Sequence, residues 1–135
     1  MEAVLALWAA AGAHPTSTDD APALLTLMAR DPEALLLATA AGETVGTLVV
    51  AWDGWRGNLY RLAVHPERRR TGMASALVAE AERRLRARGC RRISALVVPT
   101  DQGAIDFWRA VGYDPHPMDR YVRHLGPGNG TGTAD

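Results

Sequence analysis

The sequence contains no lysine, so arginine supplies all fifteen of its basic residues. Fifteen acidic residues balance them, and the formal net charge is zero. No overall field therefore draws the chain toward nucleic acid or an anionic membrane, and we expect neither as a partner. Together with the many alanines, the missing lysine indicates a GC-rich genome.

Cysteine is equally scarce: Cys90 stands alone, so it cannot form an internal disulfide, and it fits a reducing compartment. No segment approaches the roughly 18 consecutive apolar residues that a membrane-spanning helix needs. The apolar stretch Ala3–Ala13 is short and has no basic residue before it, unlike a signal peptide. We therefore expect a soluble, cytoplasmic protein.

Metal-ligand patterns are also missing. The histidines His14, His116 and His124 do not stand at ligand spacing from cysteine or acidic residues, so the sequence predicts no metal site. A nucleophilic triad cannot be argued from any spacing either.

The richest pattern runs from Leu62 to Leu77. An aliphatic strand end meets Pro66, which cannot donate a ladder hydrogen bond and so predicts the end of the strand. A run of arginines follows, then Gly72, which lets the backbone lie against a ligand. Apolar residues at 3.6-residue spacing then predict a helix over Met73–Ala87. Helix amides beside arginines indicate a site for a di- or polyphosphate.

The rest of the chain alternates helical and extended patterns. At 135 residues we expect one domain over residues 1–125 and an irregular Gly/Thr/Pro-rich tail over 126–135. The predicted helices are Glu2–Ala11, Asp19–Arg30 (capped by Thr18), Met73–Ala87 and Asp101–Val111. The predicted strands are Leu35–Thr39, Thr44–Trp52, Leu59–His65, Arg92–Val98 and Tyr121–Leu125.

Two segments resemble motifs of one known family. Arg69–Ala74 resembles the acyl-CoA loop of the GNAT N-acetyltransferase superfamily, Gln/Arg-x-x-Gly-x-Gly/Ala. Asp101–Tyr113 is similar to the family helix Asn-x-x-Ala-x-x-Phe-Tyr-x-x-x-Gly-Phe, and it follows the loop in the family's order. Between Leu35 and Arg92 the sequence looks most similar to the bacterial YpeA-like branch, whose members mostly lack an assigned substrate.

The resemblance implies an α/β (α+β) GNAT fold, with a mixed, mostly antiparallel central sheet flanked by helices. The given sequence opens within its first predicted helix, without the family's usual first strand: either its start is truncated or that strand is dispensable here. Without that strand the edge of the next strand is unpaired, and an unpaired edge tends to pair with other chains. Another subunit would cover this edge. We therefore expect a homodimer.

The resemblance also implies acetyl-CoA as co-substrate. Backbone groups of a strand end would pair with the pantetheine arm, and loop amides would bind the pyrophosphate. The cofactor-binding residues so implied are Leu62, Ala63, Val64, Arg69, Arg70, Thr71, Gly72, Met73, Ala74, Ser75 and Asp101. Asp101 stands where the family has asparagine. Its carboxylate can cap a helix but cannot donate a hydrogen bond when ionised.

The acid–base residues depart from the family pattern. Trp108 stands where many relatives have a tyrosine that protonates the leaving thiolate, and indole is no usable acid near neutral pH. Leu96 stands where the ribosomal-protein N-terminal acetyltransferases have a glutamate base. Strand alternation places Tyr60 on the same face as Leu62, so Tyr60 is the candidate catalytic residue, as a proton relay.

We thus expect an N-acetyltransferase that moves an acetyl group from acetyl-CoA directly to a primary amine of a small molecule or peptide. The alternative is a non-catalytic acyl-CoA-binding or sensor module. A mixture of carboxylates and aromatics in the first helices and the C-terminal part would suit a cationic amine. These residues are Trp8, His14, Asp19, Asp20, Trp52, Trp55, Tyr113, His116 and Asp119.

Overall fold

The computed structural model describes residues 1–13 and 16–126. In chain order the elements are α1 (Glu2–Ala10), α2 (Ala21–Arg30), β1 (Leu35–Ala40), β2 (Glu43–Trp52), β3 (Gly57–Val64), the 3-10 turn η1 (Pro66–Arg68), α3 (Met73–Ala87), β4 (Ile93–Ala95) and α4 (Gln102–Ala110). Apart from Gly126, the predicted tail lies outside the described residues.

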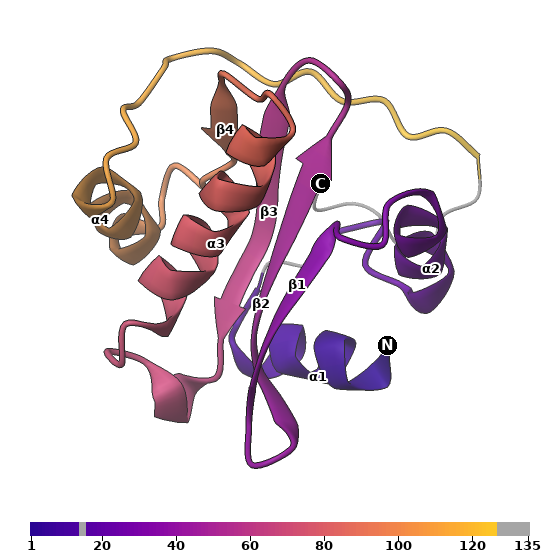
Figure 1. The fold of residues 1–135 in the computed structure, drawn as a ribbon, viewed down its shortest axis with the longest axis vertical. Helices are drawn as coiled ribbons and strands as arrows, with labels where there is room; N and C mark the ends of the chain where they lie inside the picture. Colours follow the sequence, from indigo (N-terminus) through magenta and orange to yellow (C-terminus); the bar gives the residue numbers. More distant parts are fainter. Residues whose placement is uncertain (14–15, 127–135) are drawn as a thin grey trace.

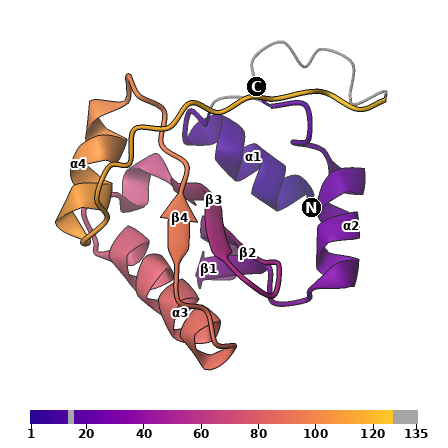
Figure 2. The ribbon, with the colours of Figure 1, turned by 90° about the horizontal axis from the view of Figure 1, so that it is seen from above.

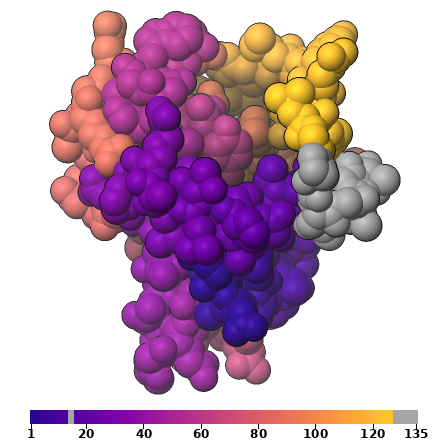
Figure 3. Space-filling view, turned by 90° about the vertical axis from the view of Figure 1, so that its right-hand side faces the viewer, coloured from indigo at the N-terminus to yellow at the C-terminus, as the bar shows by residue number. Residues whose placement is uncertain are grey.

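The four strands form one sheet in the order β1-β2-β3-β4. The first three pair antiparallel, and β4 pairs parallel with β3, so the predicted mixed, mostly antiparallel sheet is confirmed. Helices cover both faces of the sheet, with α3 on one side and α1 and α2 on the other (Figures 1 and 2). Figure 3 shows the N-terminal residues, in indigo and violet, over the second face.

Two apolar clusters hold these layers together. The first packs α3 and Trp108 of α4 against one face of the sheet, and it includes Leu48, Val50 and Leu59. The second packs α1 and α2 against the opposite face, and it includes Val49 and Ala63. Because both faces are covered, β2 is buried continuously from Val45 to Val50.

A β-bulge interrupts the alternation of β3. Thr47 of β2 lies opposite Ala63, but Val49 lies opposite Tyr60, so β3 carries one extra residue across from Leu48. Arg61, at the bulge, has a left-handed φ of 54°.

The bulge overturns the predicted facing of Tyr60. Tyr60 lies opposite Val49 on the α1–α2 side, whereas Leu62 packs against the cluster on the α3 side. The prediction that they share a face is wrong because the extra residue reverses the alternation between them.

Three other expectations also need correction. Asp20, not Thr18, caps the second helix: its Oδ1 accepts from the Ala23 amide at 2.8 Å, and the helix begins at Ala21. The strand predicted over Arg92–Val98 is only Ile93–Ala95, because its partner strand diverges after that point.

The predicted strand Tyr121–Leu125 is not a strand. The segment runs without regular structure across the end of the molecule, from α4 toward α2 (Figure 2). Tyr121 is 93% and Leu125 is 87% exposed, so the segment has neither a strand partner nor apolar burial to hold it in a sheet. No helix among the described residues is long and apolar enough to cross a bilayer.

Candidate functional site

The sheet opens between β3 and β4. The two strands pair only where Gly57–Leu59 lies beside Ile93–Ala95, yet β3 continues to Val64. In the described part of the chain, no strand pairs with Tyr60–Val64 on the side where β4 pairs with Gly57–Leu59. The predicted contact residues Leu62, Ala63 and Val64 belong to this stretch, and their backbone groups that do not pair with β2 form an open strand edge, which an extended ligand can join.

A buried hydrogen-bond chain fixes the bulge at this edge. The indole Nε1 of Trp8 donates to Thr47 Oγ1 at 2.8 Å, and that hydroxyl donates to the Arg61 carbonyl at 3.1 Å. The Arg61 guanidinium in turn binds both carboxylate oxygens of Asp19, at 3.1 and 2.5 Å. Thr47 is fully buried, so its hydroxyl depends on these two partners.

Sequence reasoning missed Thr47 and Arg61. One signal was present, because Thr47 is a polar residue inside the apolar run Val45–Val50. Its meaning depended on the register of β3, which the sequence does not show.

The loop after β3 leads directly to the first turn of α3. His65 Nδ1 accepts from the Glu67 amide at 3.2 Å, which gives this histidine a structural role at the start of η1. Arg70 and Gly72 both have left-handed φ, 62° and 81°. For a non-glycine residue such a φ is strained, and strain of this kind often accompanies a functional loop.

Gly72 is the N-cap of α3 and provides no side-chain cap. The first amides of the helix, at Met73, Ala74 and Ser75, have no partner within the helix itself. A Cβ built on Gly72 meets nothing within 4 Å, so the space in front of this turn is open. The arrangement fits an anionic group at a helix N-terminus.

Close packing sets the position of this turn. An ideal Cβ on Gly46 of β2 would lie 2.9 Å from the Met73 sulfur and 3.2 Å from a Leu77 methyl. The absence of a side chain at Gly46 thus lets the start of α3 approach the sheet. Met73 is consequently half-buried and serves packing, whereas the neighbouring Ser75 is exposed.

The arginines of the loop differ in their contacts. Arg69 donates to the Ala11 carbonyl at the end of α1, at 3.0 Å, so its guanidinium is partly occupied. The Thr71 hydroxyl donates to the Arg68 backbone carbonyl at 2.6 Å. Arg68 and Arg70 are both exposed beside the α3 N-terminus.

The second motif forms α4, with Asp101 as its N-cap. Its Oδ1 accepts from the Ala104 amide at 3.0 Å, which confirms the predicted cap. Trp108 is buried and packs edge-to-face against Phe107 and Tyr113, with ring centroids 5.3 and 4.9 Å away. Trp108 therefore belongs to the core.

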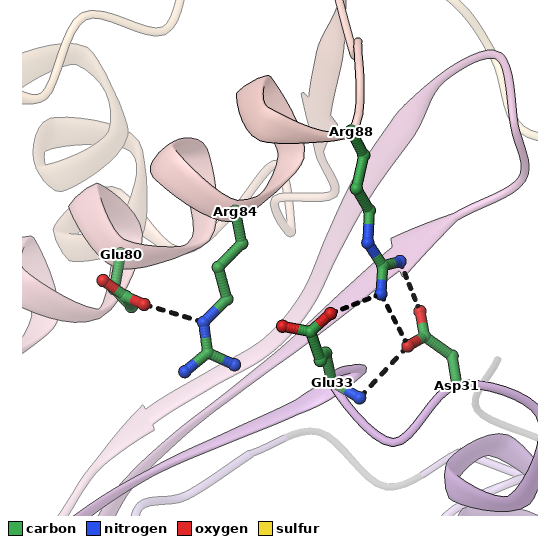
Figure 4. Close-up of polar contacts among 5 residues, drawn as sticks. All are labelled: Asp31, Glu33, Glu80, Arg84 and Arg88. Atoms are coloured by element: carbon green, nitrogen blue, oxygen red, sulfur yellow. Dashed lines mark hydrogen bonds and ion pairs between the residues drawn. The ribbon is translucent and has the colours of Figure 1, made fainter.

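Like Trp108, Tyr113 is not available as a general acid. Its hydroxyl donates to Glu82 Oε2 at 2.8 Å. Burial, and then the bond to Glu82, raise the pKa of Tyr113. On the same helix, Arg84 forms an ion pair with Glu80 at 2.7 Å (Figure 4).

Tyr60 is 37% exposed on the α1–α2 side of the sheet. Burial raises the pKa of its phenol above the ordinary value; Arg120 opposes this rise and Asp53 adds to it. The phenol therefore stays protonated near neutral pH, where it can donate to a water or a substrate but cannot act as a base.

Several residues proposed for the acceptor pocket serve the fold. Trp8 and Asp19 belong to the hydrogen-bond chain of the bulge, and Asp20 caps α2. Trp52 ends β2 and Trp55 lies in the β2–β3 turn, at the far end of β3 from Val64. His14 lies outside the described residues. In the described ranges, no group of three or more histidine, cysteine or acidic residues is placed to hold a metal ion.

Comparison with known proteins agrees with this geometry. An acetyltransferase of Photorhabdus laumondii is 41% identical over 103 residues, which cover 76% of this chain and 71% of the relative. An acetyltransferase of Pectobacterium atrosepticum is 34% identical over 113 residues, covering 84% and 80%.

Solved structures share the fold at low identity. The aminoglycoside N-acetyltransferase AAC(6')-Iy, in complex with the bisubstrate analog CoA-S-monomethyl-acetylneamine, superposes with a TM-score of 0.68 and 21% identity, covering 92% of this chain and 90% of that one. The ribosomal-protein-S18-alanine N-acetyltransferase of Escherichia coli gives a TM-score of 0.68 and 20% identity, covering 94% and 79%. The fold class that the two motifs implied is confirmed.

The Acetyltransferase (GNAT) family matches residues 1–113, which include the open strand edge, the Gly72 loop and all of α4. With a family match over most of its length and relatives named acetyltransferases, this chain belongs to the acetyltransferase (GNAT) family.

Proposed function

We propose that this enzyme moves an acetyl group from acetyl-CoA directly to a primary amine of a small molecule or peptide. One observation carries the proposal. The open edge Leu62–Val64 and the uncapped first turn of α3 are joined by a single short loop, residues 65–72. An extended, amide-bearing arm that ends in phosphates suits such a pair of adjoining surfaces.

The donor is proposed to bind along both surfaces. Backbone groups of Leu62, Ala63 and Val64 would pair with the pantetheine arm, and the amides of residues 69–75 would bind the pyrophosphate. Arg70 is exposed and able to contact a phosphate, whereas Arg69 would have to leave the Ala11 carbonyl to do so. Asp101 stays a predicted contact at the N-terminus of α4, where its carboxylate can only accept.

Bound acetyl-CoA supplies an activated thioester. A backbone amide of the open edge would polarise its carbonyl, a contribution worth roughly 3 kcal/mol in other acyl-transfer sites. An amine is mostly protonated near neutral pH, so its proton must leave before attack. Tyr60 is proposed to hold a water that would receive this proton, because its own phenol stays neutral, and the departing thiolate would take its proton from solvent.

Amine acetylation draws support from the proteins of similar fold, two of which are named N-acetyltransferases. Their own acceptors, an aminoglycoside and a ribosomal-protein alanine, differ widely, so they do not narrow the acceptor of this chain. We further propose that the enzyme works in the cytoplasm, where a reducing environment suits its single cysteine, Cys90.

The test is to supply acetyl-CoA with a panel of primary amines and to follow the release of free thiol. We expect release that depends on an amine and is lowered at least about tenfold in kcat by Tyr60→Phe, which removes the relay hydroxyl. Tyr121→Phe, at a tyrosine that is 93% exposed, is the matched control and should change nothing. Unchanged turnover in Tyr60→Phe would remove Tyr60 from the mechanism.

A second candidate function is a non-catalytic acyl-CoA-binding or sensor module. The burial of Trp108 and the bond between Tyr113 and Glu82 favour it, because neither side chain is free to protonate a leaving thiolate. Thermal stabilisation by acetyl-CoA, without thiol release for any amine, would support the sensor and contradict the transferase.

A further inference from the structure

A polar groove lies at the opposite end of α3 from the Gly72 loop. It has a volume of about 480 Å³ and is lined by two tryptophans and four arginines: Trp52, Trp55, Arg56, Arg88, Arg91 and Arg92. The 15 residues of α3 separate the two places by about 22 Å of helix. The groove is therefore distinct from the proposed acyl-CoA site.

Two segments far apart in the sequence form its walls. The β2–β3 turn contributes Trp55 and Arg56, and the connection from α3 to β4 contributes Arg91 and Arg92. Figure 3 shows these segments, in magenta and salmon, next to each other at the upper left. The Gly57 amide donates to the Arg92 carbonyl at 3.0 Å, which ties one wall to the other.

One of the four arginines is already neutralised. Arg88 donates to both carboxylate oxygens of Asp31, at 2.8 and 3.0 Å, and to Glu33 at 2.7 Å (Figure 4). These contacts link the end of α3 to the loop between α2 and β1. Arg88 thus has a structural role.

The other three arginines have no such partner. In residues 1–13 and 16–126, neither Arg56, Arg91 nor Arg92 forms an ion pair. The nearby carboxylate of Asp53 accepts from the amides of Trp55 and Arg56, both at 2.7 Å, and these bonds lower its pKa. In a chain of zero net charge, this concentration of unpaired guanidinium groups favours an anionic ligand.

The groove also offers an aromatic surface. Trp55 is 69% exposed, and the guanidinium carbon of Arg56 lies 4.0 Å from the centre of a Trp55 ring. Exposed indole rings and guanidinium groups are surfaces on which a nucleobase packs well. The volume falls within the range of small-ligand sites rather than requiring a macromolecule.

We propose that this groove binds a nucleotide carrying two or more phosphates. Its base lies against Trp55 and its phosphates contact Arg91 and Arg92. Both arginines are exposed, so their planar guanidinium groups are available to bind phosphate oxygens through two hydrogen bonds each. The site is independent of the acetyl-transfer reaction, and its test needs no turnover.

The experiment is calorimetric titration of the full chain with ATP, inorganic tripolyphosphate and adenosine at low salt. We expect one ATP per chain, weaker binding of tripolyphosphate, and the weakest binding of adenosine. The double variant Arg91→Gln/Arg92→Gln should weaken ATP binding at least tenfold. Trp55→Ala should remove the preference for ATP over tripolyphosphate.

Two matched variants keep the result specific. Arg83→Gln/Arg86→Gln removes the same charge from another exposed part of α3 and should change ATP affinity less than twofold. Gly72→Val alters the proposed acyl-CoA loop and should leave ATP binding unchanged. Circular dichroism of each variant confirms that it is folded.

The proposal is overturned by an absence of ATP binding or by an equal loss in the Arg83/Arg86 control. It is also overturned if Gly72→Val abolishes ATP binding while Arg91→Gln/Arg92→Gln retains it, because ATP would then occupy the acyl-CoA loop. ATP and tripolyphosphate binding equally tightly would exclude the base contact at Trp55.

Discussion

At the scale of single residues, a buried threonine determines which way the reactive part of β3 faces. Thr47 joins the Trp8 indole to the carbonyl of Arg61, where β3 bulges. Beyond this bulge Leu62 faces α3, whereas without the extra residue it would share a face with Tyr60. One hydroxyl group therefore links the core of the α1–α2 side to the geometry of the open edge.

Replacing Thr47 with valine keeps the shape of the side chain and removes the hydroxyl. We expect the free energy of unfolding to fall by about 1–3 kcal/mol, because Trp8 Nε1 and the Arg61 carbonyl lose a buried partner. Urea unfolding of the purified variant measures the loss. Thr47→Ser keeps both hydrogen bonds and should lose less, and equal losses in the two variants would contradict this role.

Gly72 is the second residue with a decisive position, since it combines a left-handed φ with open space before the α3 amides. In Gly72→Val the side chain enters that space and strains the backbone, so acetyl-CoA should no longer raise the melting temperature. Differential scanning fluorimetry with and without acetyl-CoA measures this shift.

The matched control is Gly42→Val in the β1–β2 turn. Gly42 also has a left-handed φ, 80°, and nothing within 4 Å of a built Cβ. This variant carries the same backbone strain and should keep its response to acetyl-CoA. A normal shift in Gly72→Val would show that the loop assignment is wrong.

At the scale of elements, α3 runs from the Gly72 loop to the groove lined by arginines, and different contacts hold each of its ends. Its N-terminus packs against Gly46, and near its C-terminus Arg88 binds Asp31 and Glu33. The predicted bounds of this helix, Met73–Ala87, are confirmed, because its apolar spacing and flanking glycines are local signals.

The Arg88 contacts predict a pH dependence of stability. The hydrogen bond from Arg88 holds the pKa of Asp31 below its ordinary value, so the folded state binds fewer protons there than the unfolded chain. This stabilisation is fully present above the unfolded pKa of about 4 and is lost as the pH falls through the lower folded value.

In Arg88→Gln we expect the free energy of unfolding at neutral pH to fall by at most about 1 kcal/mol, since the pairs are partly exposed and screened. The difference from the wild type should shrink as the pH falls below about 4. Denaturant unfolding at pH 7 and at pH 3 tests both parts. A difference that is unchanged at pH 3 would show that Asp31 is not the partner that matters.

At the scale of the whole molecule, the sheet has uncovered edges. β1 is the outer strand of the order β1-β2-β3-β4, so in the described residues one of its edges pairs with no strand. Unpaired strand edges are sites where a second chain can add. The predicted homodimer would cover such an edge.

Light scattering coupled to size-exclusion chromatography measures the molar mass in solution. A homodimer should give about twice the 14.5 kDa of one chain. A mass of one chain at micromolar concentration would exclude the dimer and leave the β1 edge open to solvent.

Much of this architecture can be predicted from the sequence alone. The Gly72 loop, α3 and the Asp101 cap each depend on residues within a few positions of one another, so local propensity and spacing predict them. The family motifs carry the same local information, and the match over residues 1–113 agrees with them.

Only the tertiary structure decided what depends on partners distant in the chain. The bulge that separates Tyr60 from Leu62 arises from pairing with β2, and β4 is short because β3 diverges from it. The groove lined by Arg56, Arg91 and Arg92 forms because the hydrogen bond from the Gly57 amide to the Arg92 carbonyl brings the β2–β3 turn beside the connection from α3 to β4. Spacing along the sequence determines which elements form, whereas register and packing between elements determine which side chains share a site.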